Sequence, residues 1–221
     1  MKKLFFEIEK DGFYGTYYEN PKESDCVVIG LFGDDPNDYM AKCGAKWLHK
    51  NGVNVLCMSP GKKNYSHVNY PLERIETAIQ WLKKNGNRKI GIMGMSTAGM
   101  DSLVAASYFP DITLTFGLTP SDFVWQGFEQ GEKDGCKEWP VPGASTLSWK
   151  GEPLAYMPFV YEHGTHFVLP ESLLRKALPV GLKFVLRFVF KAAKDYPKEC
   201  EATRKDIDRR LSAALNEWRE E

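Results

Sequence analysis

A serine set among small residues is the part of this sequence whose spacing points most directly to chemistry. Ser96 stands in Gly94-Met95-Ser96-Thr97-Ala98-Gly99, after the apolar run Ile90–Met95 and before a helical pattern that reaches about Tyr108. A buried strand, a sharp turn with a central serine and a helix form the layout of a nucleophile elbow. The pattern predicts Ser96 as a nucleophile. The alternative is an ordinary strand-to-helix turn that carries a serine.

A serine hydroxyl needs a general base within hydrogen-bond reach, and histidine is the usual one. The sequence has four histidines. His49 ends a predicted helix at the amino end of the next strand, which is the wrong end of the sheet. His67 lies in the polar loop 61–69 after a strand, from which it could approach the site, but the sequence has no other feature that marks it.

The other two histidines, His163 and His166, follow the short apolar run Pro158–Tyr161. In a doubly wound sheet this loop opens at the same edge as the elbow, where ligands bind. We predict His166 as the base because Gly164 and Thr165 give it a flexible approach, and we hold His163 in reserve. The two histidines could instead bind a metal, but no third ligand cluster accompanies them, so we predict no metal site.

Acyl transfer also requires hydrogen-bond donors for the oxyanion. The backbone N–H of Thr97, at the start of the elbow helix, should be one donor. The second should come from Gly33 or Asp34, in the loop after the apolar strand Asp25–Phe32. This loop is acidic, which is unexpected beside a developing negative charge, although its backbone can still donate.

Strands and helices alternate along the first half of the chain. The predicted hairpin strands are Lys3–Glu9 and Phe13–Tyr18, the later strands are Asp25–Phe32, Val53–Met58, Ile90–Met95 and Asp111–Leu118, and the helices are Tyr39–Lys50, Pro71–Lys84 and the elbow helix. This alternation predicts an α/β fold, with a mostly parallel, doubly wound sheet that has helices on both faces and an antiparallel hairpin at its start.

The segment 126–157 is rich in glycine, proline and tryptophan, and we expect a lid-like excursion with little regular structure. Trp125 and Trp149 either line an acyl pocket and bind substrate, or seal the excursion onto the core. Residues 170–221 are expected to form helices. Within them, Leu182–Lys194 carries a basic stripe, which favours a helix packed on the sheet with one solvated edge over a membrane-surface or dimer helix.

Composition bounds the remaining possibilities. The 221 residues suit a single domain, 1–221, and the formal net charge of zero gives no reason to expect a nucleic-acid partner or an anionic membrane. No segment is apolar for long enough to span a bilayer. The five cysteines are scattered, which suggests free thiols and a cytoplasmic protein. The sequence predicts no cofactor, and it is compatible with a homo-oligomer.

With Ser96 and His166 placed, the chain resembles the α/β-hydrolase superfamily. The likeness is greatest to the dienelactone-hydrolase-like C-terminal domain of acyl-CoA thioester hydrolases and bile acid-CoA:amino acid N-acyltransferases. The matching pieces are Leu31-Phe32-Gly33, the residues around Ser96, Ser148-Trp149-Lys150-Gly151-Glu152-Pro153-Leu154, Tyr161, and Gly164-Thr165-His166 ahead of Pro170. The resemblance implies acyl-ester, thioester or acyl-transfer chemistry on a small acyl substrate, with Ser96 as nucleophile.

Two departures from this family stand out. Its eukaryotic members carry an N-terminal β-sandwich domain, whereas this sequence opens on the predicted hairpin, so we do not expect coenzyme A specificity to carry over. The family also places its triad acid after a late strand between serine and histidine, and no such strand is evident here. Asp122, after the strand Asp111–Leu118, is the best-placed substitute. The site could otherwise work weakly as a dyad, or the chain could be a degenerate relative.

Three functions follow from these observations. The first is a serine hydrolase of a small acyl ester or thioester that uses Ser96, His166 and Asp122. The second is a non-catalytic binding protein on a hydrolase fold, which the missing strand motivates. The third is an acyltransferase, in which an amine replaces water in resolving the acyl-enzyme.

Overall fold

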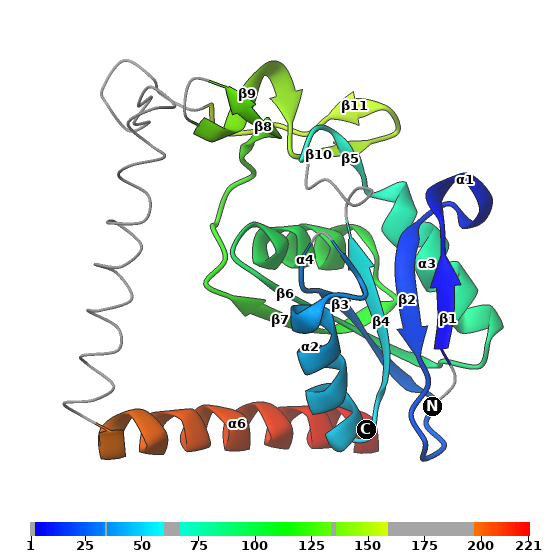
Figure 1. Cartoon of the computed structure of the whole chain (residues 1–221). Helices are drawn as coiled ribbons and strands as arrows, with labels where there is room; N and C mark the ends of the chain where they lie inside the picture. The colour runs from blue at the N-terminus through cyan, green and yellow to red at the C-terminus, as the bar shows by residue number, and fades with distance from the viewer. Residues whose placement is uncertain (1–2, 34, 60–66, 134–135, 159–196) are drawn as a thin grey trace. The chain divides into compact units, whose positions relative to one another are not determined.

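The computed structural model describes residues 3–33, 35–59, 67–133, 136–158 and 197–221 (Figure 1). The chain divides into two compact units, Met1–Gln130 with Pro140–Val160, and Gly131–Trp139 with Tyr161–Glu221. The described helix of the second unit is α6 (Pro197–Glu220), in the tail where the sequence predicts a helix. The candidate site residues that the structure describes all belong to the first unit.

The first unit is built on a sheet of six described strands in the order β1-β2-β4-β3-β6-β7. Their bounds are β1 (Lys3–Phe6), β2 (Tyr14–Tyr18), β3 (Cys26–Leu31), β4 (Asn54–Ser59), β6 (Lys89–Met95) and β7 (Ile112–Leu118). Strand β2 is antiparallel to both β1 and β4, and the other pairings are parallel. The predicted mixed α/β fold with a mostly parallel sheet is confirmed.

The first connection differs from the expected tight turn. β1 ends at Phe6, and a short helix, α1 (Ile8–Asp11), follows where the sequence predicts strand up to Glu9. The Asp11 carboxylate accepts a hydrogen bond from the backbone N–H of Glu7 (2.9 Å). Gly12 then ends the turn at a φ of 81°, a conformation that glycine adopts without steric cost. The chain therefore leaves the strand after Phe6 and forms a helical turn at Ile8–Asp11.

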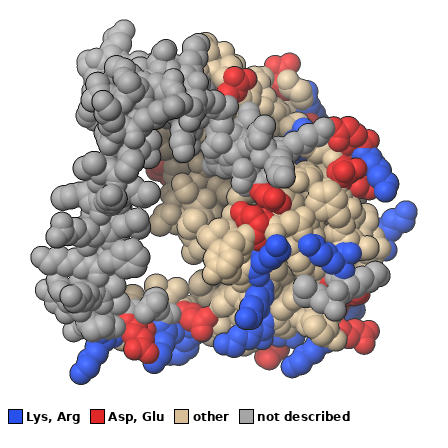
Figure 2. Space-filling model, viewed as in Figure 1, with Lys and Arg blue, Asp and Glu red and all other residues tan. Residues whose placement is uncertain are grey.

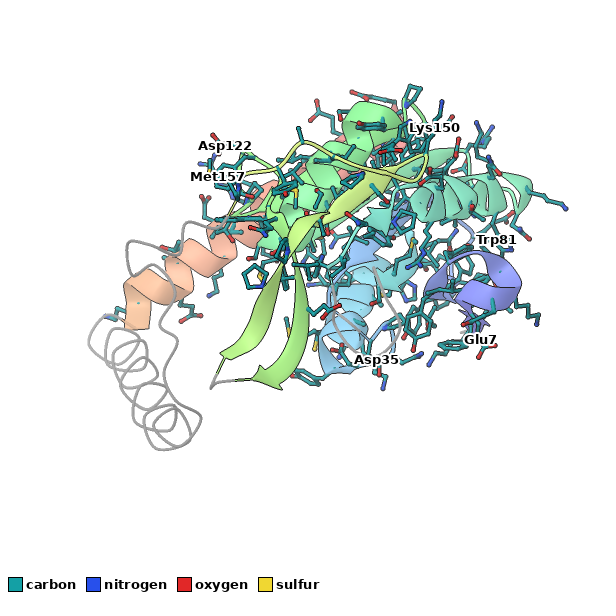
Figure 3. The ribbon with its side chains drawn as sticks, turned by 90° about the horizontal axis from the view of Figure 1, so that it is seen from above. Glu7, Asp35, Trp81, Asp122, Lys150 and Met157 are labelled. Atoms are coloured by element: carbon teal, nitrogen blue, oxygen red, sulfur yellow. The ribbon has the colours of Figure 1, made fainter. Side chains whose placement is uncertain are left out.

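Helices cover both faces of the sheet (Figures 1 and 3). They are α2 (Tyr39–Lys50), α3 (Glu73–Lys84) and α4 (Thr97–Tyr108). Consecutive side chains of a strand point to opposite faces, and β2 separates the two layers in this way. The Tyr17 ring packs on Trp81 of α3, whereas the Tyr18 hydroxyl donates to the carbonyl of Pro36, just before α2.

Every residue of β3 and β4 is buried, which explains why their sequences are nearly continuous apolar runs. A hydrophobic core cluster lies on the face covered by α3 and α4, and it includes Ile29, Leu56, Ile92, Leu82 and Met100. The predicted helices at 39–50 and 97–108 are confirmed. The predicted helix at Pro71–Lys84 begins instead at Glu73, because Tyr70–Pro71 forms the short strand β5.

The segment 126–157 is more regular than the sequence suggests. It contains β8 (Gln126–Lys133), β9 (Cys136–Ser145), β10 (Leu147–Trp149) and β11 (Glu152–Pro153), so the expectation of little regular structure is wrong. β8 pairs with β9, and β10 lies between β5 and β11. β9 contains Pro140 and Pro142, and proline, which has no backbone N–H, is tolerated in strands that are not paired on both sides.

The sheet described by the structure ends at β7, and the late strand that the family resemblance calls for is not among the described residues. Three other predicted segments lie largely or wholly outside the described residues. They are the short apolar run Pro158–Tyr161, predicted as a final strand, the helix expected from about Pro170, and the segment 182–194. None of the helices that the structure describes is both long and apolar enough to cross a membrane. On the face seen in Figure 2, acidic and basic side chains are interspersed.

Buried asparagines join the strands at the amino end of the sheet. Asn54 accepts a hydrogen bond from the backbone N–H of Asn20 (2.9 Å) and donates to Asn87 Oδ1 (2.9 Å). It also donates to the carbonyl of Ser24 (2.8 Å). His49 belongs to the same end, with its Nε2 3.0 Å from the carbonyl of Tyr18. The structure thus places His49 away from the carboxyl edge, where the elbow lies.

We expect Asn54→Ala to lower the free energy of unfolding by about 3 kcal/mol, because it leaves buried partners unsatisfied at three hydrogen bonds. The control is Asn85→Ala. Asn85 is exposed, and its side chain donates a hydrogen bond to the carbonyl of Trp81. This control should change stability by no more than about 0.5 kcal/mol. Urea denaturation measures both variants, and equal effects would contradict the role given to the buried network.

Candidate active site

Ser96 has the backbone conformation of a strained turn. It caps the N-terminus of α4 with a φ of 56° and a ψ of −125°, which a non-glycine residue rarely adopts. Its N–H donates to the carbonyl of Leu118 (2.9 Å), and its carbonyl accepts from the N–H of Met100 (3.1 Å). The residue is exposed. Strand β7 and helix α4 therefore hold the turn in place from both sides.

Gly94 is the residue that lets strand and helix come together. A β-carbon at this position would overlap the carbonyl group of Ala98 and would lie 2.7 Å from Ser102 Oγ. Ser102 Oγ in turn donates to the carbonyl of Ala98 (2.8 Å). β6 and α4 thus meet at a separation that only glycine permits at position 94. This is the steric requirement that the small residues of the motif predict.

The two proposed oxyanion donors follow neighbouring strands. β3 and β6 are parallel with Leu31 opposite Gly94, so Gly33 and Ser96 each lie two residues beyond a paired position. Thr97 is the first residue of α4, and its N–H has no helical carbonyl to bond. Gly33 has a φ of 143°, in a region that favours glycine. This register puts both backbones at the carboxyl edge of the sheet.

The acidic loop after Gly33 uses its carboxylates locally. Asp35 accepts from the N–H of Asn37 (2.8 Å), and Asp38 caps α2 by accepting from the N–H of Ala41 (2.7 Å). Asp34, the alternative donor, lies outside the described residues. These hydrogen bonds give local partners to Asp35 and Asp38, two of the three carboxylates whose negative charge was unexpected beside an oxyanion site.

Asp122, the predicted substitute acid, is exposed in the loop after β7. It lines a pocket beside α4 that does not include Ser96, and no described hydrogen bond joins the two residues. In Figure 3, Asp122 lies next to Met157, which agrees with the bond from the Met157 N–H to the carbonyl of Val124 (2.8 Å). The structure brings Asp122 to the elbow's side of the sheet without joining it to the serine.

The two tryptophans have different surroundings. Trp125 contacts the Phe123 ring (4.6 Å between centroids), close to the pocket that includes Asp122. Trp149 packs edge-on against Phe109 (5.7 Å) and Tyr108 (5.4 Å), at the opposite end of α4 from Ser96. Trp149 therefore has the contacts of a residue that seals the excursion onto the core, which is the second of its two predicted roles.

His163 and His166 lie outside the described residues. Of the remaining histidines, His67 has surroundings that the sequence did not reveal. Its Nδ1 lies 3.8 Å from Oδ2 of Asp101, and each side chain is 1% exposed. His67 also exchanges two backbone hydrogen bonds with Phe128 (3.0 and 2.9 Å), and the two rings stack at 5.1 Å. The excursion strand β8 thus holds His67 against α4.

One feature of the sequence could have indicated the contact between His67 and Asp101. Asp101 is the single charged residue in a helix of small and apolar residues, and such a residue is rarely buried without a function or a partner. The pair does not face the serine, however. Asp101 follows Ser96 by five positions, which corresponds to a rotation of about 140° around α4. His67 is therefore not positioned as the base for Ser96.

Burial dominates the titration of the pair. It lowers the pKa of His67 to about 4 and raises the pKa of the Asp101 carboxyl to about 8. Both shifts arise because a charge loses its hydration in the protein interior. Since groups this close titrate together, the pair as a unit holds one proton between these limits, whichever atom carries it.

These shifts predict a fall in stability as the pH rises from 6.5 to 8. Between pH 4 and 6.5 the unfolded chain carries its proton on His67 and the folded pair carries one as well, so the contributions cancel. Between 6.5 and 8 only the folded pair holds a proton, so its contribution falls by about 2 kcal/mol. We expect Asp101→Asn to abolish this fall.

Urea unfolding across this pH range measures the effect as the difference between wild type and variant. The exposed Asp111, which bonds Lys83 at the surface, gives the matched control Asp111→Asn, and this control should keep the fall. A fall of the same size in Asp101→Asn would show that the proton resides elsewhere.

Among the residues that the structure describes, no three His, Cys, Asp or Glu side chains gather as a metal site would require.

No family model matches the chain. No curated protein matches it either. Solved structures give partial matches. An esterase from Pyrococcus furiosus has 23% identity and a TM-score of 0.40, with 49% of this chain and 44% of that chain covered. Est1E from Butyrivibrio proteoclasticus has 19% identity and a TM-score of 0.41, with 53% and 51% covered. The chain thus spans about half the length of these two structures.

Proposed function

We propose that this chain is a serine hydrolase of the α/β-hydrolase fold that cleaves a small acyl ester or thioester. Ser96 Oγ attacks the carbonyl carbon, and its proton passes to a histidine. The tetrahedral intermediate then expels the alcohol or thiol, which takes that proton, and an acyl-serine remains. Water then attacks the acyl carbon and gives a proton to the histidine. The second tetrahedral intermediate expels Ser96 Oγ, which takes that proton, and the carboxylic acid leaves.

The conformation of Ser96 is the observation that carries this proposal. A φ of 56° in a serine is strained, and the bond to the Leu118 carbonyl together with the close approach at Gly94 maintains it. Such strain persists where the surrounding structure enforces it, and it occurs disproportionately at active sites. It supports a serine whose hydroxyl is presented to a substrate rather than used in packing.

The N–H groups of Thr97 and Gly33 are the proposed oxyanion donors. Because Leu31 and Gly94 are opposite each other, these backbones follow adjacent strands at one edge of the sheet. The start of α4 adds the positive end of a helix dipole at the position where negative charge develops. Donors held by strands and a helix need no reorganisation when the intermediate forms.

His166 is the proposed base, and Asp122 is the proposed acid that orients it. Both assignments come from the sequence. The surroundings of the two histidines that the structure describes support this choice. His49 lies at the amino end of the sheet, and His67 is buried against Asp101 on another side of α4. Asp122 lies in the loop after β7, at the same edge of the sheet as Ser96, which is the position that supports this role.

A fluorophosphonate probe tests the nucleophile directly. We expect a covalent adduct on Ser96, located by mass spectrometry, and no adduct in Ser96→Ala. Since the base activates the serine, His166→Ala should slow labelling by a factor on the order of 10³. The matched control is Ser24→Ala, which changes a serine just before β3. In this control, Ser96 should be labelled at the wild-type rate.

Asp122→Asn separates a triad from a dyad. Loss of an orienting acid lowers turnover on the order of 10⁴-fold, whereas Asp111→Asn should leave turnover unchanged. A folded wild-type protein that takes up no probe would overturn the proposal and favour the non-catalytic binding protein. Product analysis with added glycine or taurine distinguishes hydrolysis from transfer to an amine.

A further inference from the structure

A pocket of about 210 Å³ lies along helix α4. Four residues of α4 form its inner wall, and the loop after β7 forms its outer wall. The lining residues are Met100, Leu103, Val104, Ser107, Ser121, Asp122, Phe123 and Val124. Asp122, the proposed triad acid, is the one candidate site residue in this lining, and neither Gly33 nor the His67–Asp101 pair contributes to it.

The inner wall lies on the same side of α4 as Ser96. Met100, Leu103 and Ser107 follow Ser96 by four, seven and eleven residues, a spacing that places all of them on one face of a helix. Met100 lies in the turn that Ser96 caps, because the Ser96 carbonyl accepts the N–H of Met100 (3.1 Å). Side chains on a helix tilt toward its N-terminus, so this wall leads up to the serine, about one turn, or 5.4 Å, away.

The outer wall is attached to the elbow. Its loop begins at Leu118, whose carbonyl accepts the N–H of Ser96 (2.9 Å). Pro120 then packs on the elbow helix, since a β-carbon at Gly99 would lie 3.3 Å from the Pro120 β-carbon. Both walls are therefore fixed to the segment that carries Ser96, and they keep their place relative to it.

The chemistry of the lining selects an apolar group. Ser107 Oγ donates to the carbonyl of Val104 (2.7 Å) and Ser121 Oγ donates to the carbonyl of Phe123 (2.9 Å), so both hydroxyl protons are used within the walls. Asp122 is the one charged residue of the lining, and it disfavours a second negative charge. At about 30 Å³ per water-sized group, the volume suits about seven non-hydrogen atoms.

We propose that this pocket receives the acyl chain of the ester that Ser96 attacks, and that it selects uncharged acyl chains of medium length over acetyl groups and over chains that end in a carboxylate. The inference rests on the proposed hydrolase function, and it names the substrate class of that same site. The ester carbonyl lies at Ser96 while the chain extends along α4 between Leu103 and Phe123.

Filling the pocket tests the assignment. Leu103 is 43% exposed, so Leu103→Trp can add its ring from the surface without disturbing the core. We expect the ratio of kcat/KM for p-nitrophenyl octanoate to that for p-nitrophenyl acetate to fall at least about tenfold in this variant. Phe5→Trp is the matched control, because Phe5 is 48% exposed on β1, and it should keep the wild-type ratio.

An unchanged ratio in Leu103→Trp would overturn the inference and leave the hydrolase proposal standing. If the wild-type protein hydrolyses neither ester, the hydrolase proposal fails instead, and titration with octanamide decides the pocket. Saturable binding of octanamide to Ser96→Ala that weakens at least about tenfold on adding Leu103→Trp supports an acyl-binding pocket. Absence of saturable binding rejects it.

Discussion

The close approach of β6 and α4 at Gly94 is the constraint on which the rest of the candidate site depends. No side chain larger than hydrogen fits against the carbonyl of Ala98, so strand and helix meet at one separation. That separation forces Ser96 into its strained turn, and the Leu118 carbonyl maintains it. The N-terminus of α4, with the proposed oxyanion donor Thr97, and the inner wall of the α4 pocket take their positions from this junction.

The two ends of the sheet have separate tasks. At the amino end, buried asparagines bond to one another and to strand carbonyls, and so fix the strands where no chemistry occurs. At the carboxyl end, Asp38 caps the N-terminus of α2, and the strained Ser96 caps that of α4. Side-chain hydrogen bonds thus join the strands at the amino end, whereas the proposed site lies at the carboxyl end.

The His67–Asp101 pair shows how the excursion is joined to the elbow helix. β8 bonds to the backbone of His67, and β10 bonds to the segment around Tyr70, so residues 67–73 are held between the excursion and α4. Burial of two ionisable side chains carries a desolvation cost, which the pair reduces by remaining neutral overall. A buried acid on α4 thereby links the excursion to the same helix that carries Ser96.

The sequence by itself determined the layout of the sheet and the identity of the elbow. Continuous apolar strands, helix periodicity and the small residues around Ser96 act locally, so their pattern can be read along the chain. Only the tertiary structure decided the partner of His67, the regular strands in the excursion and the position of Trp149. Each of these depends on residues distant in sequence, such as Phe128 against His67 and Phe109 against Trp149. Long-range packing leaves no periodic signal, because its energy depends on which surfaces meet and not on the order of residues within one segment.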